Sequence, residues 1–177
     1  MLRFPLVNKT VAFFSVLHII MVSVCKRSAW EVGNMATVFD VAKYILEQRG
    51  KLSTMKLQKL CYYAQAWSLV WDDEPLFDED FEAWANGPVC PELFSFSKGQ
   101  FAVTPEEMRG DSANLSNGQK DTIDEVLRYY GDKNAQWLSQ LTHMEDPWKD
   151  ARQGLLPGQR CNSVVSKESM AMYYGGL

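Results

Sequence analysis

The stretch "KLQKLCYYAQAWSLVW", from Lys56 to Trp71, decides the fold class. Its apolar residues recur every three or four positions, which is the repeat of an α-helix. One apolar stripe contains Leu57, Leu60, Cys61, Ala64, Trp67 and Trp71, and a second contains Tyr63, Ala66 and Val70. Because a helix that is apolar around most of its circumference is buried, this helix is predicted at the centre of the fold. Lys56 and Lys59 are expected to mark its solvent-facing side.

Shorter helical segments flank this central helix. Residues that cap helix N-termini precede several of them, namely Thr37, Ser53 or Thr54, Ser116 and Ser166. Helices are expected over 37–49, 53–71, 116–130, 134–143 and 167–174, with Pro91 and Pro147 opening two short ones. Gly50 and Gly131 are natural helix stops.

The segment after the central helix predicts a turn and a little β-structure. Seven of the eleven residues from Asp72 to Glu82 are acidic, and Pro75 prevents the helix from continuing. The alternation around Phe81 predicts a short strand, paired near 76–77, and Asn86-Gly87-Pro88 predicts a turn. The expected fold is therefore mainly α: a compact single-domain helical fold with one small β-hairpin after the second core helix. The stretches 100–115 and 154–162 are expected to be surface loops.

The first 34 residues form an N-terminal extension to a domain that covers residues 35–177. The apolar run "VAFFSVLHIIMVSVC" (Val11–Cys25) follows Arg3 and Lys9, as in a secretion signal, but it is short for a membrane span. Three interpretations compete: translation that starts at Met35, a membrane or export segment, and an ordered helix packed on the domain.

Charge and cysteine content restrict the function classes. Residues 35–177 contain 14 basic and 21 acidic side chains, so nucleic-acid phosphates would be repelled unless basic residues gathered on one face. The four cysteines form no C-x-x-C pair, and no nucleotide-binding motif occurs. The acidic run lacks the calcium-loop pattern, which favours a solvated face or a docking surface for a basic partner. We therefore expect a cytoplasmic protein with reduced thiols and with no cofactor or metal.

One pair of residues could support catalysis. Cys90 lies between prolines and near a predicted helix N-terminus, where thiolates are favoured. His143, followed by Glu145 and Asp146, is the one imidazole in residues 35–177 and could act as its base. The plainer interpretation is that Cys90 is a small turn residue and that a cationic His143 stabilises the end of its helix.

Three motifs in order resemble a known family. They are "KLQKLCYYAQAWSLVW", "PLFDEDFEAWANGPVCPELF" (Pro75–Phe94) and "LSQLTHMEDPWKDAR" (Leu138–Arg152). Together they resemble the Panacea domain of SocA-like antitoxins and phage-associated GepA-like proteins, over residues 35–174. The extension 1–34 is a departure from that domain.

The resemblance implies a mostly helical antitoxin, not an enzyme. Members of the family neutralise an unrelated toxin protein, usually encoded beside them and often in a prophage, by direct binding. At least one member delivers its toxin to an ATP-dependent protease. A hydrolase that uses Cys90 and His143, and a DNA-binding autoregulator, remain as alternatives.

Two segments contain the candidate partner-binding residues. Because Pro88 and Pro91 restrict the backbone, the turn is expected to have its shape before a partner arrives. The candidates are Trp84, Gly87, Pro88, Val89, Pro91, His143, Pro147 and Trp148. The alternative is that the turn only joins a strand to a helix and packs Trp84 inward.

Overall fold

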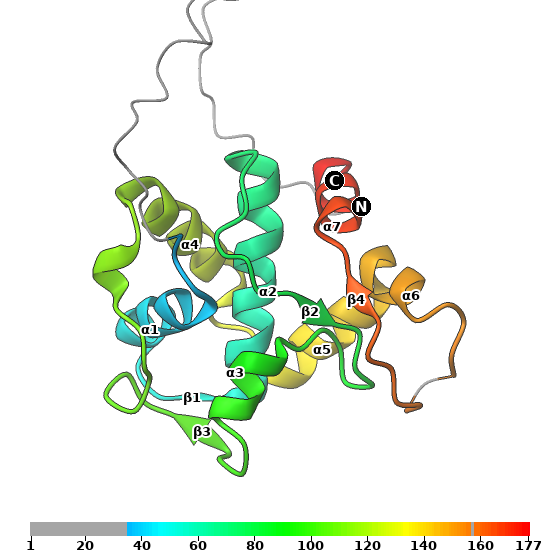
Figure 1. Ribbon diagram of the computed structural model, residues 1–177, viewed down its shortest axis with the longest axis horizontal. Helices are drawn as coiled ribbons and strands as arrows, with labels where there is room; N and C mark the ends of the chain where they lie inside the picture. Colours follow the sequence, from blue (N-terminus) through cyan, green and yellow to red (C-terminus); the bar gives the residue numbers. More distant parts are fainter. Residues whose placement is uncertain (1–34, 157) are drawn as a thin grey trace, which may run out of the picture. The chain divides into compact units, whose positions relative to one another are not determined.

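The computed structural model describes residues 35–156 and 158–177 of the chain. The expectations for residues 1–34 therefore lie outside the described residues. Residues 35–176 form one compact unit. The described part is built mainly from helices, as predicted, with two small two-stranded antiparallel sheets (Figure 1).

The α-helices of the described residues follow the predicted segments closely. They are α1 (Val38–Arg49), α2 (Thr54–Trp71), α3 (Pro91–Phe96), α4 (Asn117–Tyr130), α5 (Ala135–Met144), α6 (Asp146–Ala151) and α7 (Lys167–Gly175). The strands are β1 (Leu52–Ser53), β2 (Phe81–Glu82), β3 (Ala102–Val103) and β4 (Val164–Val165). A 3₁₀-helix, η1 (Ser112–Asn114), lies in the predicted loop 100–115.

Local hydrogen bonds begin the helices where the sequence predicts. Thr37 and Asp40 form a capping box at α1, and Ser116 and Gln119 form one at α4. The side chains of Ser53, Asn134 and Ser166 each accept an N–H from the first turn of α2, α5 and α7.

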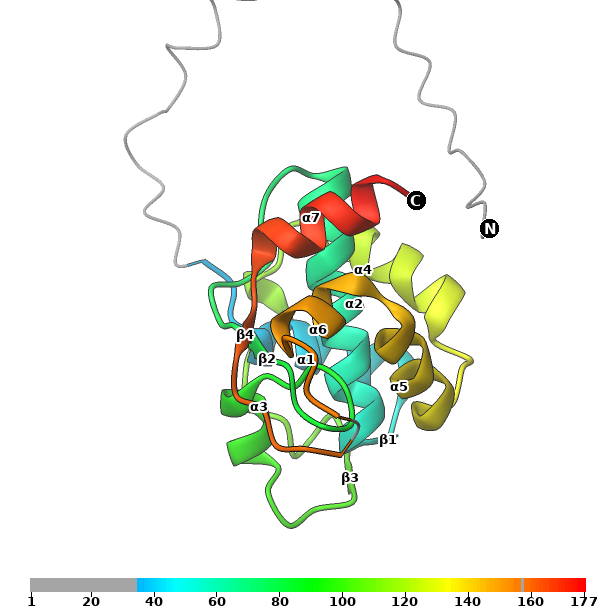
Figure 2. The same ribbon diagram turned by 90° about the vertical axis from the view of Figure 1, so that its right-hand side faces the viewer.

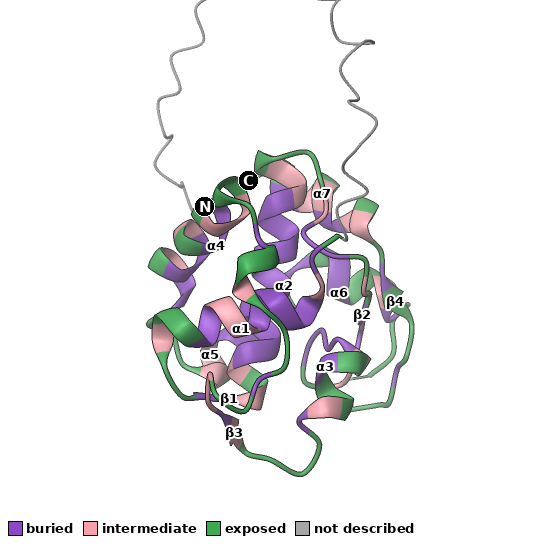
Figure 3. Ribbon diagram, turned by 60° about the vertical axis from the view of Figure 1, so that its left-hand side comes forward, coloured by how far each residue is buried: buried purple, intermediate pink, exposed green. Residues whose placement is uncertain are grey.

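Helix α2 passes through the centre of the domain, as its two apolar stripes predict. Every residue from Leu57 to Ser68 is buried, and the ribbon coloured by burial is almost continuously purple there (Figure 3). Helices α1, α4, α5 and α7 pack around it (Figures 1 and 2). Within the described residues, no helix combines the length and the apolar character that crossing a membrane requires.

The predicted pairing of the strand at Phe81 is wrong. Strand β2 pairs with β4, in the register Phe81 with Val165, and not with residues 76–77. The backbone of residues 76–77 is bound instead by the buried side chain of Gln65. Its Oε1 accepts the N–H of Leu76 at 2.9 Å, and its Nε2 donates to Phe77 O at 2.9 Å. Those backbone groups are therefore not available to a strand.

The last helix is held by a buried hydrogen-bond network. The hydroxyls of Tyr63, on α2, and Tyr174, on α7, both donate to Glu145 Oε2, at 3.1 and 2.7 Å. Glu145 is buried, and this burial raises its pKa to about 7 despite the two donors. The network joins α2, α7 and the connection between α5 and α6.

Candidate functional site

The predicted turn at residues 86–88 is closed by its own backbone. Glu82 N–H donates to Val89 O at 2.8 Å, and Val89 N–H donates to Glu82 O at 3.0 Å. Inside this ring, Gly87 N–H donates to Trp84 O at 3.0 Å. We refer to residues 83–90 as the Gly-Pro turn.

Helix α2 binds one side of the Gly-Pro turn. The Gln58 amide pairs with both backbone groups of Cys90, donating to its carbonyl at 3.1 Å and accepting its N–H at 2.9 Å. The next residue, Lys59, donates from Nζ to Pro88 O at 2.8 Å. The buried polar face of α2 therefore satisfies backbone groups that the irregular segment cannot pair by itself.

Side chains from α5, α6 and the residue after α6 bind other carbonyls of the turn. The donors are Ser139 Oγ to Asn86 O (2.8 Å), Trp148 Nε1 to Trp84 O (2.9 Å) and Arg152 Nη1 to Ala83 O (2.7 Å). Arg152 is buried, and its guanidinium also lies over the Trp148 ring, 4.8 Å from the centroid. The three segments that resemble the family motifs therefore meet at this turn, which is held on two sides.

Gly87 occupies a position that no other residue fits without strain. Its φ of +97° lies in the left-handed region, which L-residues with a side chain rarely adopt. A Cβ there would lie 2.6 Å from Thr142 Oγ1 and 2.8 Å from Lys59 Nζ. The turn, α2 and α5 therefore approach one another as closely as they do because residue 87 lacks a side chain.

The candidate partner-binding residues divide into two groups by exposure. Trp84, Pro91 and His143 are half-buried. The other five are buried and pack inside the domain: Gly87, Pro88, Val89, Pro147 and Trp148. The Trp84 indole contacts Phe94 edge-on, with centroids 4.8 Å apart, and donates from Nε1 to Glu82 Oε2 at 2.7 Å. A direct role in binding a partner stays a prediction for all eight.

A small pocket opens where the Gly-Pro turn meets the first turns of α2. Its volume is about 230 Å³, and Met55, Trp84 and Phe94 contribute apolar wall, with Met55 and Phe94 39% and 38% exposed. The other lining residues are Thr54, Gln58, Lys59, Ala85, Asn86, Val89 and Ser97. We refer to this feature as the turn pocket.

The expectation that Lys59 faces solvent is wrong. Its side chain is 1% exposed and lines the turn pocket, whereas Lys56 is half-buried and donates from Nζ to Gly131 O at 2.6 Å. Burial lowers the pKa of Lys59 to about 7. Sequence reasoning missed this residue, although one signal was present. Lys59 lies between Gln58 and Leu60 on a helix that is apolar around most of its circumference, so most of its possible positions are buried.

The structure does not bring Cys90 and His143 into a catalytic pair. The Cys90 thiol contacts Glu92 Oε2 at 3.2 Å, and burial raises its pKa to about 12, which disfavours a thiolate. The His143 ring stacks on Trp148, with centroids 4.2 Å apart, and its Nε2 has no hydrogen-bond partner among the described residues. Burial, and then the charges of Lys59 and Arg152, lower the pKa of His143, so the structure opposes the expected cation at this helix end.

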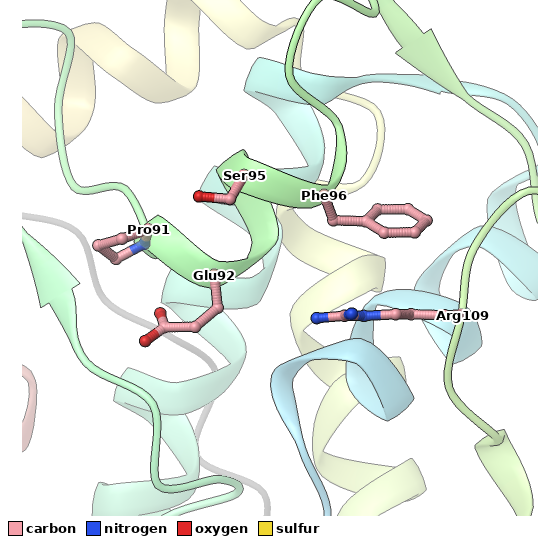
Figure 4. Close-up of a pocket in the computed structure, with 5 residues that line it drawn as sticks. All are labelled: Pro91, Glu92, Ser95, Phe96 and Arg109. Carbon is pink, nitrogen blue, oxygen red and sulfur yellow. The ribbon is translucent and has the colours of Figure 1, made fainter.

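A second, more open groove lies beside α3 (Figure 4). It is lined by Pro91, Glu92, Ser95, Phe96 and Arg109. The Arg109 guanidinium lies 3.6 Å from the ring centroid of Phe39 and 5.4 Å from that of Phe96, so it fastens the loop before η1 to α1 and α3. Across residues 35–156 and 158–177, no cluster of His, Cys, Asp or Glu is suited to hold a metal ion.

Comparison with known families shows which family the chain resembles. The family described as "Antitoxin SocA-like, Panacea domain" matches residues 57–149, slightly more than half of the chain. The matched range contains most of α2, the Gly-Pro turn, α5 and the first four residues of α6. No curated protein and no solved structure matches the chain.

Proposed function

Because the chain belongs to the family of SocA-like antitoxins with a Panacea domain, we propose that it is an antitoxin that neutralises a toxin protein by binding it directly. Family membership is the observation that carries this proposal. The matched residues include every element that holds the Gly-Pro turn except Arg152.

The geometry of the Gly-Pro turn supports a binding function. Its carbonyls are held by side chains of α2, α5 and α6, so a partner would meet a surface whose backbone is already ordered. Binding to an ordered surface costs less conformational entropy than ordering a loop at the moment of contact. The exposed edges of Met55 and Phe94, beside half-buried Trp84, offer apolar contact there.

Co-expression with the product of the neighbouring gene tests the proposal. That product should arrest growth when expressed alone, and the full chain should restore growth and copurify with it. A neighbour that is harmless alone, or that is toxic but never associates with this chain, would refute the proposal.

Two matched variants test which surface binds the toxin. Phe94→Ser alters the rim of the turn pocket, whereas Met172→Ser alters an 81% exposed methionine on α7. Helix α7 packs against α2 through Tyr174, which contacts Trp67, whereas the pocket lies at the N-terminal end of α2. We expect Phe94→Ser to weaken copurification and Met172→Ser to leave it unchanged, with both variants folded by circular dichroism.

The toxin's half-life separates masking from delivery to an ATP-dependent protease. Masking predicts that the toxin level stays constant after translation is blocked, and delivery predicts a rapid loss of the toxin. A gel shift with the promoter DNA tests autoregulation. The 14 basic and 21 acidic residues of 35–177 predict no salt-sensitive binding to that DNA.

A further inference from the structure

Lys59 is a buried amine without an acidic partner. Its Nζ donates to one acceptor, Pro88 O, although an ammonium group carries three N–H donors. The ion pairs within residues 35–156 and 158–177 join other residues and do not include Lys59. Buried lysines are normally paired because an isolated charge is costly to desolvate.

Apart from exposed Asn86, the other polar side chains that line the turn pocket already form hydrogen bonds. Gln58 uses both ends of its amide on Cys90, and the hydroxyls of Thr54 and Ser97 donate to main-chain carbonyls. Among the buried side chains that line the pocket, Lys59 therefore has N–H donors left for a ligand. Its four-carbon stem allows the ammonium to turn toward a ligand while the stem stays packed.

The size and charge of the turn pocket fit an acidic side chain. A volume of about 230 Å³ is below the usual range for small-molecule sites, about 300–1,000 Å³, and suits one protein side chain. The apolar walls suit a methylene stem, and the N-terminal end of α2 adds partial positive charge. Exposed Lys51 and Lys98 lie close in sequence to wall residues Thr54 and Ser97.

We propose that the turn pocket receives an aspartate or glutamate side chain of the toxin, whose carboxylate pairs with Lys59. The methylene stem of that side chain contacts the apolar wall formed by Met55, Trp84 and Phe94. This inference rests on the proposed antitoxin function for the identity of the partner, but the preference of the pocket for a carboxylate can be measured on the isolated chain.

The first experiment uses two probes of equal size on the full wild-type chain. N-acetyl-glutamate N-methylamide should shift the Trp84 indole and Val89 amide resonances saturably, and its glutamine counterpart should bind at least about tenfold more weakly. The Lys59 pKa, followed through its Cε resonance, should rise by about one unit or more with the glutamate probe. Equal binding of both probes, or no shift with either, would overturn the proposal. Stronger binding of N-acetyl-leucine, through its free α-carboxylate, would overturn the assignment to a side chain.

Two lysine variants supply a matched comparison. Lys59→Met keeps the length of the side chain without its charge, and Lys56→Met makes the same change on α2 outside the pocket. Both lysines donate to a main-chain carbonyl, so both variants lose one comparable hydrogen bond. We expect only Lys59→Met to abolish the preference for the glutamate probe and to weaken copurification with the toxin.

The two proposals fail in different ways. If the wild-type chain prefers the glutamate probe but never binds the neighbouring gene product, the antitoxin function is wrong and the pocket's preference stands. If the chain binds that product and Lys59→Met binds it equally well, the pocket assignment is wrong and the antitoxin function stands. The probe comparison needs no variant, so it decides the question even if Lys59→Met does not fold.

Discussion

Replacing Gly87 by alanine should destabilise the domain more than the same change at a glycine that has free space where a Cβ would stand. Two costs add at this position. A side chain at φ +97° costs about 1–2 kcal/mol, because Cβ is crowded in the left-handed region. The new Cβ would also lie 2.6 Å from Thr142 Oγ1 and 2.8 Å from Lys59 Nζ, and relieving such overpacking costs about 1–3 kcal/mol more.

The expected loss of unfolding free energy is therefore about 2–5 kcal/mol. For a domain of this size it lowers Tm by about 4–20 °C. Urea unfolding followed by tryptophan fluorescence measures the free energy, and a thermal scan measures Tm. Gly99→Ala is the matched control, because Gly99 has a φ of +85° and open space where its Cβ would stand. Gly99→Ala should lower the free energy of unfolding only by the backbone cost, about 1–2 kcal/mol.

A third variant isolates the contact itself. Thr142→Ala removes the atom nearest to the new Cβ, so Gly87→Ala combined with Thr142→Ala should be more stable than the sum of the two single effects predicts. If Gly87→Ala costs no more than Gly99→Ala, the close approach of the turn, α2 and α5 is not as we describe it.

Three further predictions follow from the same contacts. Gln65→Leu removes the hydrogen bonds to residues 76–77 and leaves buried backbone groups unpaired. Urea unfolding should therefore show that the free energy of unfolding falls by about 2–5 kcal/mol. A fall of less than about 1 kcal/mol would contradict the role given to Gln65. The pKa of Glu145 is raised to about 7, so folding favours its protonated form. Its contribution to the free energy of unfolding is about 3 kcal/mol. That contribution is complete below about pH 4.5 and is lost as the pH rises through about 7. Glu145→Gln should remove that part of the pH dependence, and an unchanged stability profile between pH 5 and 8 would show that Glu145 does not carry it. Cys90→Ser should leave toxin neutralisation intact in a growth assay, whereas loss of protection by a folded Cys90→Ser variant would favour the hydrolase alternative.

Most of the helical structure was predictable because its causes are local. A capping box such as that of Thr37 and Asp40 operates within three residues, and the stripes of α2 are visible in a window of 16 residues. The turn at residues 86–88 follows from its own glycine and proline. None of these features requires knowledge of which segments meet in space.

The partners of the irregular segments were not predictable in the same way. Strand β2 pairs with β4, more than 80 residues later, because Gln65 binds the backbone of the nearer candidate. The burial of Lys59 also depends on a segment that is distant in the sequence. Its charge and its spacing from Lys56 indicated a solvated face, but the Gly-Pro turn covers that side of α2 and supplies a carbonyl for its ammonium.

By itself the amino-acid sequence determined the helices, their caps, the central place of α2 and the membership of an antitoxin family. Only the tertiary structure decided that Lys59 is buried, that most of the expected contact residues support the turn from inside, and that a pocket forms at its edge. The physical reason is range. Helix periodicity and capping act over about four residues, whereas the hydrogen bonds that build this site join residues between 29 and 69 positions apart.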